Sequence, residues 1–221
     1  MTTTRDLTEQ LTDQVERETS GAGLRIDRVS APPKMLHHLA YVTHDVEATV
    51  DFYTRILGMK LVSTIIDDSV PSTGDPFPYL HLFFELSDGS TIAFFESLDL
   101  PPAAEPTHPA YAIFNHLALD AGSAAEVDRW AEHLRGNGVD VLGPIDHKII
   151  YSVYFHDPNG LRLELTATTD AAWKDHEKDA ATDVAEWIEL KRRTASSGSS
   201  AEAIEWIRRR RAKHKQSSVE S

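Results

Sequence analysis

The feature that most constrains the fold of this chain is an internal repeat. The tripeptide His38-Leu39-Ala40 returns 78 residues later as His116-Leu117-Ala118. Each copy lies in an apolar run, and a segment with the apolar spacing of an amphipathic helix follows it. Self-similarity of this kind indicates two copies of one supersecondary unit. We therefore expect a duplicated fold.

Both copies predict the same order of elements, a strand, a helix and three further strands. In the first copy these elements are expected at 36–42, 46–56, 60–66, 79–86 and 91–96. In the second copy they are expected at 114–119, 124–134, 140–142, 149–155 and 161–166. Clusters of Gly, Pro, Asp and Asn mark the turns between them. The expected fold class is α+β, with βαβββ modules at 35–100 and 110–169 that form one domain with a curved mixed sheet.

The segments on either side of this domain have a different composition. Residues 1–34 predict an N-terminal extension with one marginal helix at 7–15 and a linker. Residues 170–221 predict a helical C-terminal extension with helices at 183–193 and 201–213. The basic run at 208–211 is interpreted as a solvated or docking surface, because it belongs to no recognisable nucleic-acid-binding module.

Composition narrows the function further. The 221 residues carry 22 basic and 35 acidic side chains, a formal net charge of −13, which disfavours nucleic acid and anionic membranes as partners. No apolar run approaches the ~20 residues that span a bilayer, and the N-terminus does not resemble a secretory signal, so we expect a cytoplasmic protein. The chain has no cysteine and eleven histidines, so any metal must be held by nitrogen and oxygen ligands. A small diffusible ligand is the expected partner.

The repeat places two imidazoles at equivalent positions, and a carboxylate follows in the last strand. Strand alternation puts Glu164 on the face opposite Leu163 and Leu165. A lone histidine is usually a core residue, but His38 and His116 are paired by the repeat. Together with Glu164 they predict a facial set of two histidines and one carboxylate, which suits Fe(II) enzymes with open coordination positions.

The repeat also tests for a fourth ligand. Aligning the last strand of each module puts Ala93 at the position of Glu164. The nearest carboxylate, Glu96, is expected to face the other way unless a bulge intervenes. A coordination position without a protein ligand favours direct binding of substrate and dioxygen to the metal, whereas a fourth protein ligand would favour isomerase chemistry.

Across about 35–169 the chain resembles the vicinal oxygen chelate superfamily (glyoxalase, bleomycin resistance, extradiol dioxygenase). The segment from Ile145-Asp146-His147 to Tyr154, and on through the Asp157-Pro158-Asn159-Gly160 turn to Glu164, is similar to the signature of type I extradiol ring-cleavage dioxygenases. By this resemblance His38, His116 and Glu164 are the iron ligands, and His147 and Tyr154 are catalytic residues that hydrogen-bond the substrate. Aligning the hairpin turns puts His81 opposite Ser152, which makes His81 the candidate acid/base.

The leading hypothesis is therefore an Fe(II) dioxygenase, with Mn(II) as the alternative metal, that inserts both atoms of O2 into a catechol-like diol. The expected apolar walls of its pocket are Phe83, Phe94 or Phe95, Tyr151 and Phe155. Two alternatives stay open: a glyoxalase-like or epimerase-like isomerase or lyase with another divalent metal, and a non-enzymatic ligand-sequestering resistance protein. Most type I enzymes carry four βαβββ units and this chain carries two. Dimers are frequent in the superfamily that the chain resembles, so we expect a homo-oligomer.

Overall fold

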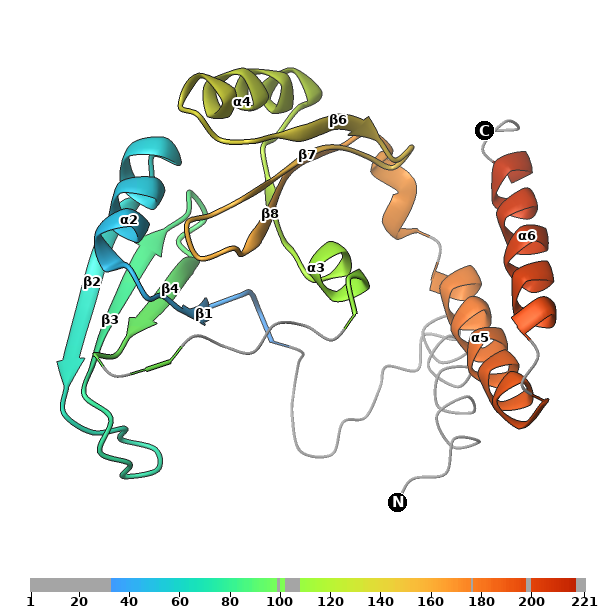
Figure 1. Cartoon of the computed structure of the whole chain (residues 1–221). Coiled ribbons are helices and arrows are strands. Elements are labelled where there is room, and N and C mark those ends of the chain that lie inside the picture. Colours follow the sequence, from blue (N-terminus) through green and yellow to red (C-terminus); the bar gives the residue numbers. More distant parts are fainter. Residues whose placement is uncertain (1–32, 99, 102–107, 176, 198–199, 218–221) are drawn as a thin grey trace. The chain divides into compact units, whose positions relative to one another are not determined.

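The computed structural model describes residues 33–98, 100–101, 108–175, 177–197 and 200–217. The helix expected at 7–15 lies outside these residues. The described chain forms two compact units, one that ends at Ala171 and one that begins at Ala172. The first unit contains both modules (Figure 1).

The first module has the expected order of elements. It comprises β1 (His38–Val42), α2 (Val46–Asp51), the π-helix η1 (Phe52–Ile56), β2 (Lys60–Asp67), β3 (Tyr79–Glu85) and β4 (Thr91–Glu96). The strands form a mixed sheet in the order β1-β4-β3-β2, with β1 parallel to β4. Asp45 caps α2, because its carboxylate accepts a hydrogen bond from Ala48 N at 2.9 Å. Apolar alternation along β3 and β4 buries one face of this sheet against α2 and η1.

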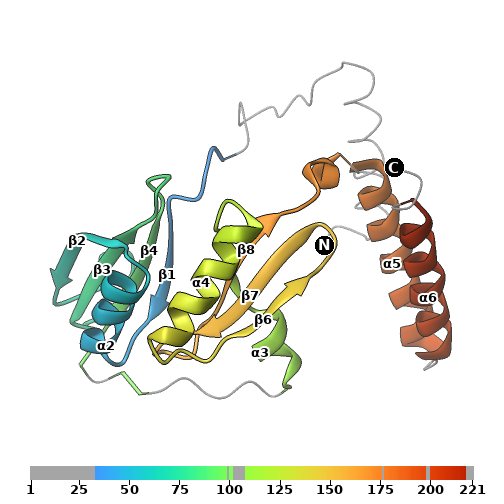
Figure 2. The same ribbon diagram turned by 90° about the horizontal axis from the view of Figure 1, so that it is seen from above.

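The second module repeats this topology. It comprises α3 (Ala110–Phe114), β5 (Leu117–Asp120), α4 (Ala124–Gly136), β6 (Leu142–Asp146), β7 (Ile150–His156) and β8 (Arg162–Thr168). Its sheet has the order β5-β8-β7-β6, with β5 parallel to β8. Ser123 caps α4 by accepting a hydrogen bond from Glu126 N at 3.2 Å. Helix α4 covers one face of this sheet (Figure 2).

Two elements of the second module differ from the sequence expectation. The strand expected at 140–142 forms instead at Leu142–Asp146, where the ladder with β7 shifts register between Leu142 and Ile145. Gly143 makes this bulge possible, since its φ is +107° and a Cβ there would lie 2.9 Å from the Ser152 carbonyl oxygen. The short helix α3 was not expected, because the sequence predicts no element at 110–113 and a strand that starts at Phe114.

The two modules confirm the expected α+β fold, and each has its own four-stranded mixed sheet. The helix-facing sides of both sheets contribute to one hydrophobic core. Tyr53 stacks on Phe84 with ring centroids 5.1 Å apart, and Phe52 meets Phe155 of the second module at 6.4 Å. The two modules therefore share their core through the helix side of each sheet.

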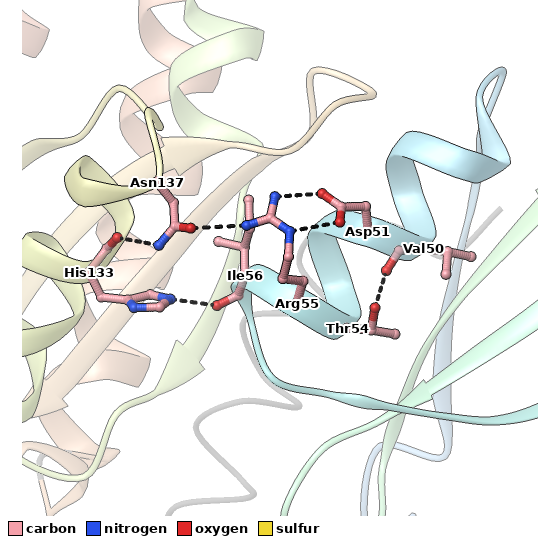
Figure 3. A network of polar contacts seen from close by, with 7 residues as sticks. All are labelled: Val50, Asp51, Thr54, Arg55, Ile56, His133 and Asn137. Carbon is pink, nitrogen blue, oxygen red and sulfur yellow. Dashed lines mark hydrogen bonds and ion pairs between the residues drawn. The ribbon is translucent and has the colours of Figure 1, made fainter.

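Polar contacts also join the modules on the helix side (Figure 3). Arg55 is held by a two-pronged ion pair with Asp51, and its Nη1 donates to Asn137 Oδ1 at 3.0 Å. His133 Nε2 lies 2.9 Å from the Ile56 carbonyl oxygen. Because Arg55 and Ile56 belong to η1 while His133 and Asn137 lie at the end of α4, these bonds connect the two helices directly.

The turn between β7 and β8 provides a second, buried connection. Asp157 accepts hydrogen bonds from the amides of Asn159 and Leu161, which closes the turn. Its Oδ2 also accepts a bond from the Tyr53 hydroxyl at 3.1 Å, and the Asn159 side chain donates to Thr49 Oγ1 at 3.1 Å. A turn of the second module is thus docked on the helix of the first.

The C-terminal unit contains two long helices, α5 (Glu177–Ser197) and α6 (Ser200–Ser217), after the 3-10 helix η2 (Ala171–Lys174). Both helices extend beyond the expected ranges. Trp187 and Trp206 pack with ring centroids 5.5 Å apart, and Trp206 Nε1 donates to Glu186 Oε2 at 3.0 Å. Arg210, within the basic run, forms an ion pair with Asp183 of α5. Among the described helices, none has the length and apolar character needed to cross a bilayer.

Candidate metal centre

The centre of the second sheet carries a buried carboxylate. Glu164 lies in β8 with only 2% of its surface exposed, opposite Ala118 of β5 and Tyr154 of β7. Its neighbours Leu163 and Leu165 point to the helix side and join the hydrophobic core. Alternation therefore places the Glu164 carboxylate on the face that the helices leave open, which we call the site face.

His116 directs its imidazole at this carboxylate. Its Nε2 lies 2.8 Å from Glu164 Oε2, and its Nδ1 lies 3.0 Å from the Phe114 carbonyl oxygen. A carbonyl oxygen only accepts, so Nδ1 carries a proton and donates it. In the neutral ring, Nε2 then presents a lone pair to a carboxylate oxygen, and a cation or a second proton must offset their repulsion. This pair fits a divalent metal, because metal-binding histidines usually donate their other N–H to a carbonyl or a carboxylate.

Tyr154 and His147 extend the same network. The Tyr154 hydroxyl donates to Glu164 Oε1 at 3.1 Å, and His147 Nε2 lies 2.9 Å from that hydroxyl. Burial, with a smaller contribution from the Glu164 charge, raises the pKa of Tyr154 above its ordinary value. Tyr154 therefore remains a protonated phenol. The Arg162 guanidinium lies over its ring, 4.3 Å from the centroid.

The first module presents a second set of side chains on its own site face. His38 lies opposite Thr91 in the ladder and is exposed. Its ring lies 5.9 Å from that of Phe83 and 6.3 Å from that of His81, measured between centroids. Its Nδ1 lies 2.8 Å from Nδ1 of His37.

His81 is the most buried histidine of this set, with 7% of its surface exposed. Its ring stacks on Phe95 with centroids 3.6 Å apart, and its Nε2 is a buried polar atom without a hydrogen-bond partner among the described residues. Burial and then the proximity of His38 lower the pKa of His81. The imidazole is therefore neutral near pH 7 and has a free polar nitrogen, as a proton acceptor requires.

The strand registers agree with the alignment of the two modules. Ala40 pairs with Ala93 as Ala118 pairs with Glu164, so Ala93 occupies the position equivalent to Glu164. Glu96 does not turn toward the site face, since its Oε1 accepts a hydrogen bond from Val46 N at the start of α2. It is therefore not available as a fourth ligand in this arrangement.

The same registers place His81 and Ser152 at equivalent positions. His81 lies opposite Phe95 in the first sheet, and Ser152 lies opposite Thr166 in the second. This agrees with the alignment of the hairpin turns from which His81 was chosen.

Several expected pocket walls lie elsewhere. Phe94 and Phe155 are buried in the core on the helix side, so they cannot line a site on the opposite face. Tyr151 also points to the helix side, where its hydroxyl donates to Asp128 of α4 at 3.0 Å. Phe83 and Phe95, which contact His81, are the expected aromatic residues that remain on the site face.

The predicted ligands do not all meet within one chain. His116 and Glu164 are in contact, but the part of the chain that the structure describes contains no group of three or more His, Asp or Glu side chains able to share one metal ion. His38 lies on the other sheet with His81, and His37 directly precedes that strand. His37 is exposed and directly precedes β1, and the sequence pattern alone gave it no role in the site. The one sequence signal for such a role is that His37 directly precedes His38, a predicted ligand.

The chain belongs to the Glyoxalase/Bleomycin resistance protein/Dioxygenase superfamily, whose family profile matches residues 35–165. It is 27% identical over 135 residues to a putative ring-cleaving dioxygenase, MhqA, of Bacillus subtilis (strain 168), across 60% of this chain and 40% of that protein. It is 29% identical over 141 residues to a lactoylglutathione lyase of Shigella flexneri, across 62% of this chain and 95% of that protein.

Among solved structures, a glyoxylase/bleomycin resistance protein/dioxygenase domain from Frankia sp. EAN1pec has a TM-score of 0.51 at 18% identity. That match covers 62% of this chain and 99% of the Frankia chain, and it shows the fold alone. This chain spans about two fifths of the length of the dioxygenase relative.

Proposed function

We propose that this protein is a non-haem Fe(II) dioxygenase that opens the ring of a catechol-like diol, with His38, His116 and Glu164 as the metal ligands. The observation that carries the proposal is the contact of His116 Nε2 with the buried Glu164 carboxylate, 2.8 Å apart. Nδ1 of the same ring is engaged by a backbone carbonyl, so the free lone pair and the carboxylate are aimed at one point. Ala93, where the repeat could supply a second carboxylate, leaves room for a chelating substrate.

We further propose that a second copy of the chain completes the site, with His38 of one copy meeting His116 and Glu164 of another. The site face of each sheet retains exposed apolar side chains. Val42, on the His38 face of β1, is 43% exposed, Ile65 beside His81 is 46% exposed, and Leu142 opposite Tyr154 is 60% exposed. Exposed large apolar residues on the same sheet faces as the predicted site residues favour a covering partner. This assembly explains how equivalent histidines on separate sheets could share one metal.

Each remaining residue has a defined task in this proposal. When bound, Fe(II) would supply the redox chemistry with O2 and would lower the pKa of a coordinated diol. Neutral His81 would accept a proton from a substrate hydroxyl. Protonated Tyr154, held by His147, would donate a hydrogen bond to a substrate oxygen and keep Glu164 in place. Phe83 and Phe95 would contact the aromatic ring and exclude water.

Oxygen uptake tests the proposal. Anaerobically purified protein is loaded with Fe(II), mixed with catechol and substituted catechols, and followed with an oxygen electrode and by the absorbance of a yellow ring-opened product. We expect one O2 consumed per diol, and loss of uptake in Glu164→Gln but not in Glu132→Gln, an exposed position on α4. No uptake by iron-loaded protein with any diol would overturn the proposed activity.

A second candidate is a metal-dependent lyase or isomerase. The alignment to the lactoylglutathione lyase spans nearly the whole of that protein, whereas the alignment to the dioxygenase spans less than half. Metal analysis of the purified protein separates the two. Bound nickel, zinc or cobalt with turnover of a hemithioacetal would favour the lyase. Full ligand affinity in chelator-treated protein would instead indicate a sequestering protein without metal.

A further inference from the structure

The two predicted histidine ligands are held in different ways. In the second module, Nδ1 of His116 is engaged by the backbone carbonyl of Phe114, two residues earlier, at 3.0 Å. In the first module, Nδ1 of His38 is engaged by a side chain, Nδ1 of His37, at 2.8 Å. The repeat puts Asn115 at the position of His37. The backbone fold therefore supplies the partner of His116 Nδ1, whereas the partner of His38 Nδ1 depends on the identity of the residue at position 37.

The contact between His37 and His38 has two possible proton arrangements. If His38 donates from Nδ1, its Nε2 carries a lone pair and can bind a cation. If His37 donates instead, Nδ1 of His38 accepts, and Nε2 of a neutral His38 carries the proton and cannot bind. A metal at Nε2 selects the first arrangement, in which His37 acts only as an acceptor.

The surrounding rings restrict how His38 can turn. The His37 ring meets it edge to face, with centroids 5.1 Å apart and planes at 78°. Phe83 meets it at 71° from the same sheet. The His81 ring meets it at 64° with centroids 6.3 Å apart. Because His38 is exposed, these three ring contacts are what define the direction of its Nε2.

We propose that His37 is the positioning residue of His38: it accepts the Nδ1 proton, fixes the tautomer and ring orientation, and so presents Nε2 to a divalent cation. This inference rests on the proposed function, since it takes His38 as a ligand. Loss of such an outer partner typically weakens metal binding by about ten- to hundredfold.

Two isosteric substitutions at the same position test the acceptor role. Asn places Oδ1 near the position of the imidazole Nδ1, so His37→Asn retains a hydrogen-bond acceptor. Leu has the same branched shape as Asn but no polar atom, so His37→Leu removes the acceptor. Asn115→Leu, at the equivalent position of the second module, is the matched control. The probe is Mn²⁺ alone, and free Mn²⁺ is measured by electron paramagnetic resonance during titration of the full chain.

We expect His37→Leu to raise the Mn²⁺ dissociation constant at least about tenfold. His37→Asn and Asn115→Leu should stay within about threefold of the unmodified protein. Circular dichroism and the melting temperature of the metal-free variants should be unchanged, which separates positioning from a folding defect. Rescue by Asn but not by Leu is the result that a merely structural role would not produce.

His38→Leu distinguishes the two levels of the argument. If His38→Leu binds Mn²⁺ as tightly as the unmodified protein, or the unmodified protein binds none, the proposed metal centre is wrong and this inference falls with it. If His38→Leu loses Mn²⁺ binding while His37→Leu retains it, the metal centre stands and only the role of His37 is overturned. Equal weakening by His37→Leu and Asn115→Leu would also overturn it.

Discussion

Replacing Tyr53 by Phe should destabilise the two-module unit by removing a single buried hydrogen bond. Tyr53 is fully buried and Asp157 is 5% exposed, and their oxygens lie 3.1 Å apart. A hydrogen bond to a charged acceptor contributes about 1.5–3 kcal/mol. Asp157 keeps the donors of its own turn, the Asn159 and Leu161 amides, so the variant does not leave the charge unpaired. Phe retains the stacking on Phe84, and we therefore expect a loss of about 2 kcal/mol.

Urea unfolding followed by circular dichroism measures this loss. With a slope of about 2 kcal/mol/M, the midpoint should fall by about 1 M at an unchanged slope. Tyr111→Phe, on an exposed side chain, is the control and should shift the midpoint little. A double-mutant cycle with Asp157→Asn should give a coupling of about 1–2 kcal/mol. A change below about 0.5 kcal/mol for Tyr53→Phe, or additive effects in the cycle, would refute the reasoning.

Three further outcomes follow from the same geometry. Burial, followed by the Asp157 charge, raises the pKa of Tyr53 well above its ordinary 10.0. The Tyr53 phenol therefore ionises first in the unfolded chain. Its contribution to the free energy of unfolding is present below about pH 10 and is lost as the pH rises further. Urea midpoints at pH 9 and 11 should therefore differ more in the unmodified protein than in Tyr53→Phe. Glu164→Gln should weaken Mn²⁺ binding at least about tenfold in equilibrium dialysis, and unchanged affinity would exclude this carboxylate as a ligand. Gly143→Ala should lower the free energy of unfolding by about 2 kcal/mol, because φ is +107° and the new Cβ would meet the Ser152 carbonyl oxygen. Gly136→Ala, with open space around the new Cβ, is the control and should not lower it. Similar urea midpoints for the two variants would contradict this reasoning.

Elements with a clear hydrophobic period were predictable from the sequence. The strand expected at 91–96 forms with those bounds, since its apolar run lies between a tight turn and a polar segment. The strand expected at 140–142 was misplaced, because a bulge at Gly143 breaks the alternation that a period-two reading needs. Helix α3 was missed because Ala110–Phe114 is only five residues long and adjoins the apolar strand β5. Such short pieces are set by tertiary context more than by local pattern.

The local geometry of the site was predictable, and its assembly was not. Alternation and the repeat suffice to put Glu164 level with Ala93 and on the face of Tyr154, because register follows from a period of two. The arrangement of the two sheets relative to each other depends on contacts between the modules. The sequence identifies the Asp157 turn but not the partner of its carboxylate, which is Tyr53, 104 positions away. No local pattern encodes such a contact.

The two faces of each sheet divide the tasks of this chain. The helix side holds the shared core and the polar connections of Tyr53 and Arg55, so substitutions there should change the free energy of unfolding and leave metal affinity unaltered. The site face holds His38 and Glu164 at positions that the shared core does not use, so substitutions there should change metal affinity first. Because the modules join through their helix sides, the first-module histidines and the His116–Glu164 pair remain separate within one chain. In the proposed assembly each module therefore supplies one half-site, and their equivalence by register is what would allow two copies of the chain to complete each other.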